Sequence, residues 1–180
     1  STGGIGGVHI EADKTFDISS DLLSLSKTSI LVVCSGPKSI LDLNKTFEMM
    51  ETLGISCIGY KTNYMPGFWY HKTNKKLHYS AKNINEICKY YNTKKNFHKK
   101  GSLLVLNPIP INKSLSKTNI DKWIKESFKI STRKKIKGKD ITPFLIKSIN
   151  KISRGKSLQA NIDLILNNAK LAAKIAVKNN

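Results

Sequence analysis

A single lysine, Lys38, stands between an apolar run and a predicted helix. The run, residues 30–34, is short, continuous and bounded by polar residues, which is typical of a buried strand. Residues 39–53 have the apolar spacing of a helix that begins directly after the lysine. A turn between a strand and a helix lies outside the carboxyl end of the strand, where α/β proteins bind ligands. Lys38 is therefore the first candidate functional residue.

The chemistry that suits Lys38 is nucleophilic attack on a carbonyl carbon. A lysine amine forms a Schiff base when its surroundings lower its pKa. The positive end of a helix dipole is one such surrounding, because it disfavours a cation. The alternative is an ordinary surface lysine at a helix start, and the same dipole makes that position unfavourable for an ammonium group.

A second polar segment places the carboxylates of Asp17 and Asp21 four residues apart, with Ser19 and Ser20 between them. Residues four apart share one face of a helix, so both carboxylates could meet one cation or one polyol. Helix capping by Asp17 or Ser19 is the alternative. His9 would complete a polar cluster, although an isolated histidine is more often a hydrogen-bonded structural residue.

A glycine-rich segment, residues 3–7, precedes His9 and could bind an anion through backbone N–H groups. It is not a dinucleotide-binding fingerprint, because His9 occupies the position of the last glycine. Gly155-Lys156-Ser157 resembles the end of a Walker loop but lacks the upstream glycine, and Ser157 fits a helix N-cap instead. For residues 3–7, an anion site and a mobile loop remain open.

The charge of the chain first suggests a nucleic-acid partner, since the formal net charge is +19 over 180 residues. However, Arg133 and Arg154 are the only arginines, whereas bidentate recognition of bases and phosphates depends on arginine. The lysines are scattered through loops that are also rich in asparagine and isoleucine. We therefore interpret them as solvated surface and expect no specific nucleic-acid partner.

The cysteine pattern and the apolar runs bear on the compartment. Cys34, Cys57 and Cys88 form no CxxC pair and no zinc-ligand spacing, which fits a reducing compartment, the cytoplasm. No apolar run approaches the roughly 20 residues that span a bilayer, and the first residues do not resemble a signal peptide. We expect no membrane partner. The glycine-rich start without an initiator methionine indicates a piece of a longer polypeptide.

Three apolar runs predict core strands at residues 30–34, 55–60 and 103–106. The first two flank the predicted helix at 39–53, so they form a β–α–β unit with parallel strands. Residues 64–70 are expected to form a turn and a short strand. Further helices are predicted at residues 21–25, 83–91 and 118–130, from Thr142-Pro143, and after Ser157.

Several motifs together resemble pseudouridine-5′-phosphate glycosidase, in that family's order and at close to its spacing. They are TGGIGGVH from Thr2, TFDISSD from Thr15, VCSGPKSILD from Val33, NPIP from Asn107, TPFL from Thr142, SLQAN from Ser157 and NNA from Asn167. The resemblance implies that residues 1–180 are the C-terminal part of one domain. It also implies an α/β/α sandwich with a mainly parallel central sheet, truncated at the N-terminus, and a homotrimer in the complete protein.

The family cleaves the C–C glycosidic bond of pseudouridine 5′-phosphate, a small-molecule substrate, and releases uracil and ribose 5-phosphate. The resemblance implies that Lys38 is the nucleophile, which attacks C1′ of the opened ribose and holds it as an imine. It also implies a divalent metal, usually manganese, at Asp17. The positions that match the family's substrate contacts and pocket-lining residues are Ser19, Ser20, Asp21, His9 and Asn161.

The chain departs from the family's pattern in two places. Residues 10–13 stand where the family usually has a basic or small residue followed by Gly-Ala-Glu, and Pro37 replaces a small residue beside the nucleophile. The family's general acid, a glutamate, and a second substrate-binding lysine belong to an N-terminal half outside these residues. We therefore expect at most trace activity from residues 1–180 alone. A non-catalytic homologue that binds a nucleotide or sugar phosphate is the alternative, and a pseudouridine kinase is a further partner that the resemblance suggests.

Overall fold

A parallel sheet of four strands organises the fold of the computed structural model, which describes residues 1–97, 100–136 and 138–179. The strands lie in the order β1-β4-β2-β3, and every neighbouring pair is parallel. Their bounds are Leu31–Cys34 for β1, Ser56–Tyr60 for β2, Ser80–Ala81 for β3 and Leu103–Leu106 for β4. The three predicted core strands are confirmed, and β4 lies between the two strands of the predicted β–α–β unit.

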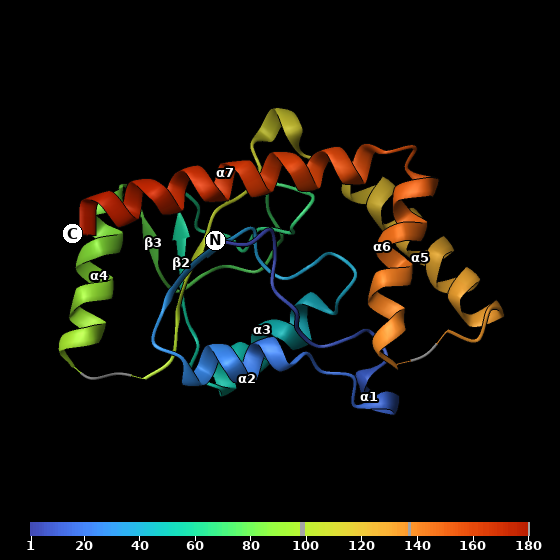
Figure 1. The fold of residues 1–180 in the computed structure, drawn as a ribbon, viewed down its shortest axis with the longest axis horizontal. Coiled ribbons are helices and arrows are strands. Elements are labelled where there is room, and N and C mark those ends of the chain that lie inside the picture. The colour runs from blue at the N-terminus through green and yellow to red at the C-terminus, as the bar shows by residue number, and fades with distance from the viewer. Residues whose placement is uncertain (98–99, 137, 180) are drawn as a thin grey trace.

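Helices cover both faces of the sheet, as the sequence predicted. Figure 1 shows α4 on one side of the strands and α2 and α3 on the other. Along β4, Leu104 and Leu106 pack with α2 and α3, whereas Leu103 and Val105 pack with α4 and α7, because successive side chains of a strand point to opposite faces. The helices are α1 Ala12–Thr15, α2 Ser20–Lys27, α3 Leu43–Thr52, α4 Ile84–Asn96, α5 Lys117–Arg133, α6 Ile141–Ile152 and α7 Lys156–Asn179. The α/β/α architecture is confirmed.

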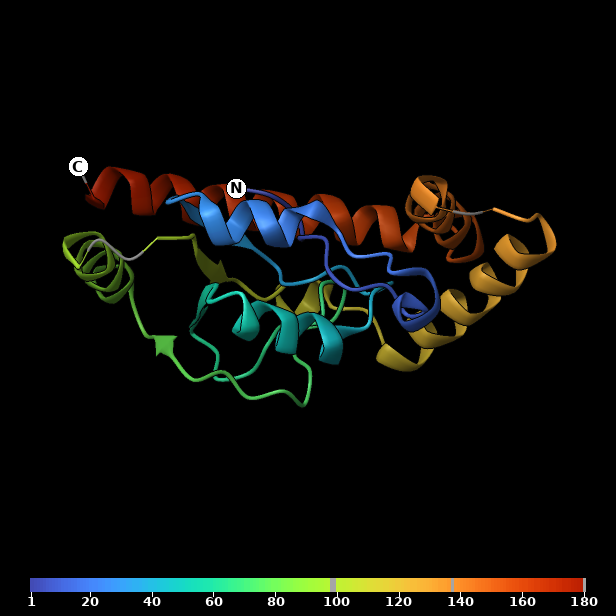
Figure 2. The ribbon, with the colours of Figure 1, turned by 90° about the horizontal axis from the view of Figure 1, so that it is seen from below.

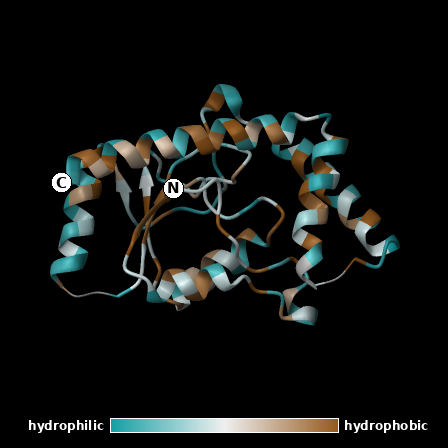
Figure 3. Ribbon diagram, viewed as in Figure 1, coloured by the Kyte–Doolittle hydropathy of each residue, from teal (hydrophilic) through white to brown (hydrophobic). Residues whose placement is uncertain are grey.

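The long helix α7 joins the sheet to a second helical unit. Its C-terminal half packs with α4, and its N-terminal half packs with α5 and α6, which lie at the opposite end of the molecule (Figures 1 and 2). Hydrophobic residues occur along much of α7 (Figure 3). Short 3-10 helices at Ile111–Lys113 and Gly138–Asp140 flank α5. In the described part of the chain, no helix is long and apolar enough to cross a membrane.

The helix after Lys38 begins later than predicted. The first helical residue of α3 is Leu43, and its N-cap Asp42 accepts a hydrogen bond from Lys45 N at 3.0 Å. Ile40 and Leu41 are both buried in a turn that Leu41 N closes on Lys38 O at 3.0 Å. Two consecutive buried side chains fit a turn better than one face of a helix. Because α3 begins only at Leu43, Lys38 does not lie at the start of a helix, and the predicted effect of a helix dipole on Lys38 is wrong.

Other boundaries also differ from the prediction. Residues 64–70 form no strand in the structure, and Tyr64 makes only an isolated bridge to Lys76. Thr142 lies inside α6, whose N-cap is Asp140, and Ser157 lies inside α7. The helix α4 extends past the predicted end at residue 91.

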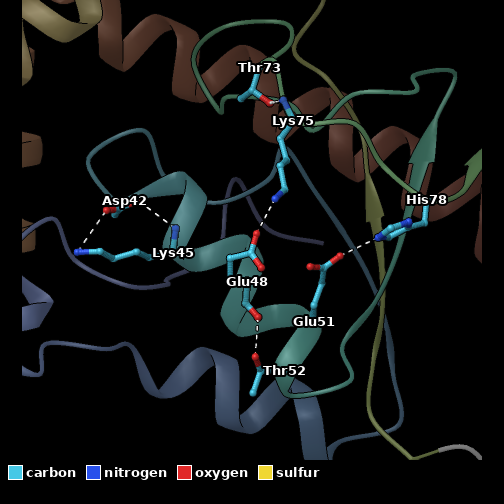
Figure 4. Close-up of polar contacts among 8 residues, drawn as sticks. All are labelled: Asp42, Lys45, Glu48, Glu51, Thr52, Thr73, Lys75 and His78. Carbon is cyan, nitrogen blue, oxygen red and sulfur yellow. Dashed lines mark hydrogen bonds and ion pairs between the residues drawn. The ribbon is translucent and has the colours of Figure 1, made fainter.

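The loop between β2 and β3 contacts α3 through an ion pair and a hydrogen bond. Lys75 Nζ lies 2.6 Å from Glu48 Oε1, and His78 Nε2 lies 2.8 Å from Glu51 Oε1 (Figure 4). The Lys75 ammonium also lies over the ring of Phe47, 4.4 Å from its centroid. These contacts lie on the outer face of α3, at the surface of the molecule.

Candidate functional site

An extended segment, residues 2–9, brings the predicted site residues together. On one side it pairs with β1 and the following turn, through Ser35 N to Gly3 O at 2.8 Å and Lys38 N to Ile5 O at 3.1 Å. On the other side Ser19 N donates to Gly7 O at 2.9 Å. Lys38 and the segment from Asp17 to Asp21 therefore flank the same extended backbone, although they belong to separate stretches of the chain.

The glycines of this segment serve close packing. A side chain on Gly6 would overlap Ser19, and a side chain on Gly7 would overlap Thr46. Residues 5–8 are buried, and Val8 N donates to Thr46 Oγ1 at 2.9 Å. The segment is therefore an ordered part of the core, which removes the mobile-loop alternative, and several of the N–H groups that an anion would need already have partners within the protein.

The turn that carries Lys38 is held from several sides. Gly36 has a φ of +86° and lies against Pro66 O, so a side chain there would be strained and crowded. Ser39 Oγ donates to Gly67 O at 2.7 Å. Lys38 is half-buried, and within the described residues no carboxylate forms an ion pair with its ammonium group. Its amine is thus available to a ligand.

A buried thiol precedes this turn. Burial raises the pKa of Cys34 to about 11, which outweighs the opposing effect of a backbone hydrogen bond at Gly36. Because the thiolate is the reactive form of cysteine, Cys34 is inert at neutral pH. The Cys34 thiol therefore does not compete with Lys38 as a nucleophile.

The segment from Asp17 to Asp21 does not form one helical face. Asp17 precedes α2, whereas Asp21 lies in its first turn, so the prediction that a helix aligns the two carboxylates is wrong. Ser19 caps α2 by accepting from Asp21 N at 3.2 Å, as the capping alternative predicted. Asp21 Oδ2 accepts from Gly6 N at 2.7 Å, which ties α2 to the extended segment. Ser20 is exposed at the start of α2.

His9 lies between an acid and a hydroxyl. Its Nδ1 lies 3.8 Å from Asp17 Oδ2, and its Nε2 lies 3.2 Å from Thr142 Oγ1. The predicted cluster of His9 with Asp17 is thus present. The contact with Thr142 could not be predicted, because Thr142-Pro143 has the pattern of a helix start.

Asn161 lies on α7 at a cleft between α6 and α7. The cleft has a volume of about 300 Å³ and is also lined by Thr142 and Ser157. Asn161 Oδ1 accepts a hydrogen bond from Trp69 Nε1 at 2.7 Å, which fixes the orientation of its amide. Asn161 and Thr142 thus line the same cleft, and the Thr142 hydroxyl group contacts His9. The role of Trp69 was not foreseen from the sequence.

The donors present fit only a water-rich metal site. The described residues contain no group of three or more His, Cys, Asp or Glu side chains that could hold a metal ion. Asp17 offers one carboxylate, which is 31% exposed. Ions of the Mg²⁺ type are commonly held by one or two carboxylates and several waters, with substrate phosphates as further ligands. Asp17 suits such a site, and a cage made of protein ligands alone is excluded for the described residues.

Sequence comparison assigns the family. The model of the family described as indigoidine synthase A like protein matches residues 1–178. The pseudouridine-5′-phosphate glycosidase of Caldanaerobacter subterraneus subsp. tengcongensis is 45% identical over 179 residues, covering 99% of this chain and 58% of that protein. The one from Staphylococcus aureus is 48% identical over 176 residues, covering 98% and 57%. The chain thus spans less than three fifths of the length of these relatives.

Two solved structures share the fold. An indigoidine synthase A-like protein from Thermotoga maritima has a TM-score of 0.89 and 37% identity, over 98% of this chain and 57% of that one. The prealnumycin C-glycosynthase AlnA, solved in complex with ribulose 5-phosphate, has a TM-score of 0.92 and 29% identity, over 99% and 59%. The resemblance found in the motifs is confirmed, and the chain belongs to the indigoidine synthase A like family.

Proposed function

We propose that the protein containing this chain cleaves the C–C glycosidic bond of pseudouridine 5′-phosphate, with Lys38 as the nucleophile. The observation that carries the proposal is the position of Lys38. It is a half-buried lysine without an ion-pair partner among the described residues, beyond the carboxyl end of β1 and next to the extended segment that binds Asp21. The names of the sequence relatives support the substrate.

In the proposed reaction the amine nitrogen donates electrons twice, and uracil accepts the electron pair of the bond that breaks. Lys38 Nζ bonds to C1′ as the C1′–O4′ bond opens, O4′ takes a proton, and the nitrogen loses one to solvent. The nitrogen lone pair then forms an iminium as the C1′–C5 bond breaks, and the electron pair leaves with uracil, which is protonated at C5. Water hydrolyses the iminium and returns the free amine and ribose 5-phosphate. We assign the acid for O4′ to the part of the protein outside these 180 residues.

The other side chains bind and orient in this proposal. Asp17 would hold a divalent cation, which we propose to be Mn²⁺, and the bound ion would supply positive charge beside the anionic substrate. Ser19 and Ser20 offer hydroxyl groups at the start of α2, and Asp21 fixes that start to the extended segment. His9, which contacts Thr142, and Asn161, which lines the same cleft as Thr142, orient the substrate in this proposal. We further propose a homotrimer in the cytoplasm that acts with a pseudouridine kinase.

Uracil release tests the proposal. The full-length protein is incubated with pseudouridine 5′-phosphate and Mn²⁺, and uracil is measured by liquid chromatography. We expect turnover that Lys38→Ala reduces more than about a thousandfold, as loss of a nucleophile does. Lys75→Ala is the control, since its ion pair with Glu48 is partly exposed. Substrate binding without uracil release would support the non-catalytic alternative instead.

A further inference from the structure

A buried asparagine on α7 connects four separate parts of the chain. Asn168 is completely buried, and its Nδ2 donates to Thr2 O at 2.9 Å, Gly3 O at 3.2 Å and Ser35 Oγ at 3.1 Å. Its Oδ1 accepts from Asn107 Nδ2 at 3.0 Å. Every polar atom of this side chain is thus satisfied inside the protein, as a buried amide requires.

The two backbone carbonyl groups determine which way this amide faces. Thr2 O and Gly3 O can only accept, so Nδ2 must face them and Oδ1 must face Asn107. Ser35 Oγ completes the network by donating to the backbone O of Asn107 at 3.0 Å. A closed network of this kind has one low-energy arrangement and fixes the segments that it joins.

The segments joined by Asn168 are those that hold the proposed nucleophile. Ser35 belongs to the turn that leads to Lys38, and its N–H donates to Gly3 O in the extended segment. We propose that Asn168 is a positioning residue, which acts through Ser35 and the extended segment to hold Lys38 in its reactive geometry. This inference rests on the proposed function of Lys38, and nothing in it requires Asn168 to touch the substrate.

The kinetic test compares two neighbouring asparagines of α7 in the full-length protein. Asn167 is the matched control, because it donates to Pro108 O at 3.2 Å and has no hydrogen bond to the Lys38 turn or to residues 2–3. For Asn168→Ala we expect kcat to fall about a hundredfold with KM little changed, since small misplacement of a reacting group costs that much. Asn167→Ala should keep kcat near the wild-type value. A change in KM of Asn168→Ala with kcat unchanged would overturn the proposal. An equal fall of kcat in the two variants would also overturn it.

Two further measurements separate positioning from general stability and from the proposed function. Ser35→Ala removes only the end of the network nearest the turn, so it remains informative if Asn168→Ala does not fold, and it should also lower kcat. Amide hydrogen exchange at Ser35, Gly36 and Lys38 should be faster in Asn168→Ala than in Asn167→Ala, whether or not the wild type turns over substrate. Unchanged exchange there would overturn the positioning role, whereas a wild type without turnover overturns only the proposed function.

Discussion

The side chain of Lys38 meets two requirements of an imine-forming amine, namely access from solvent and freedom from a carboxylate partner among the described residues. A lysine held in an ion pair would have to lose that pair before it could attack. The Asp21 carboxylate instead accepts a hydrogen bond from Gly6 N in the extended segment. The neighbouring Cys34 is kept protonated by burial. The Lys38 amine, and not the Cys34 thiol, is therefore the nucleophile that we expect to react in this turn.

Asp21 should contribute to stability as well as to the site. Asp21→Ala removes the acceptor of the 2.7 Å hydrogen bond from Gly6 N, and we expect the free energy of unfolding to fall by about 1–2 kcal/mol. Asp13→Ala is the control, because Asp13 is exposed and its pair with Lys45 is 3.5 Å long, so its effect should be below about 0.5 kcal/mol. Urea unfolding monitored by circular dichroism measures both. Equal effects of the two substitutions would contradict the structural role of Asp21.

Among the elements, the three core strands could be predicted, whereas the short strand β3 and the start of α3 could not. Continuous apolar runs such as residues 103–106 are buried on both faces, and burial is what such runs report. The start of a helix depends on which of several nearby residues becomes its N-cap. In α3 the N-cap is Asp42 and not Ser39, because Ile40 and Leu41 are buried in the turn before the helix. The same limit affected the site. The positions of His9, Asp17 and Lys38 were foreseen, but the contacts of Thr142, Trp69 and Asn168 depend on tertiary packing, which leaves no periodic signal in the sequence.

The contact between α6 and His9 can be tested at the start of the helix. Thr142→Val keeps the shape of the side chain but removes the hydroxyl that lies 3.2 Å from His9 Nε2. We expect ribose 5-phosphate to bind about fivefold more weakly, which corresponds to about 1 kcal/mol for one hydrogen bond. Thr142→Ser keeps the hydroxyl and should bind as the wild type does. Calorimetric titration of the full-length protein measures the affinities, and wild-type affinity in Thr142→Val would exclude a role for this contact in binding.

In the whole molecule, α7 has a buried apolar face and also a stripe of apolar side chains that is exposed to solvent. Its members are spaced for one side of a helix and are about half exposed: Leu158, Ile162, Ile165 and Leu166. Isolated exposed apolar residues are common, but a stripe of this kind marks an interaction surface. The relatives are longer than this chain, which covers 57–58% of them. We propose that the rest of the complete protein covers this stripe.

Ile162→Lys distinguishes a covered stripe from a free one. In residues 1–180 alone the substitution should leave the melting temperature unchanged and reduce binding of a hydrophobic dye, because Ile162 is 45% exposed. In the full-length protein it should destabilise by about 2 kcal/mol or more, because a lysine replaces a buried side chain. Calorimetric melting of both proteins gives the comparison. An unchanged melting temperature in the full-length protein would show that the stripe stays exposed.

Chemical trapping shows whether Lys38 forms an imine with the sugar. The full-length protein is incubated with ribose 5-phosphate and sodium borohydride, which reduces an imine to a stable amine, and then digested for mass spectrometry. We predict the mass of the reduced sugar adduct on the peptide that contains Lys38, present in Lys75→Ala and absent in Lys38→Ala. Imine formation by Lys38 would be excluded if the wild type gave no adduct and Lys38→Ala bound ribose 5-phosphate equally well.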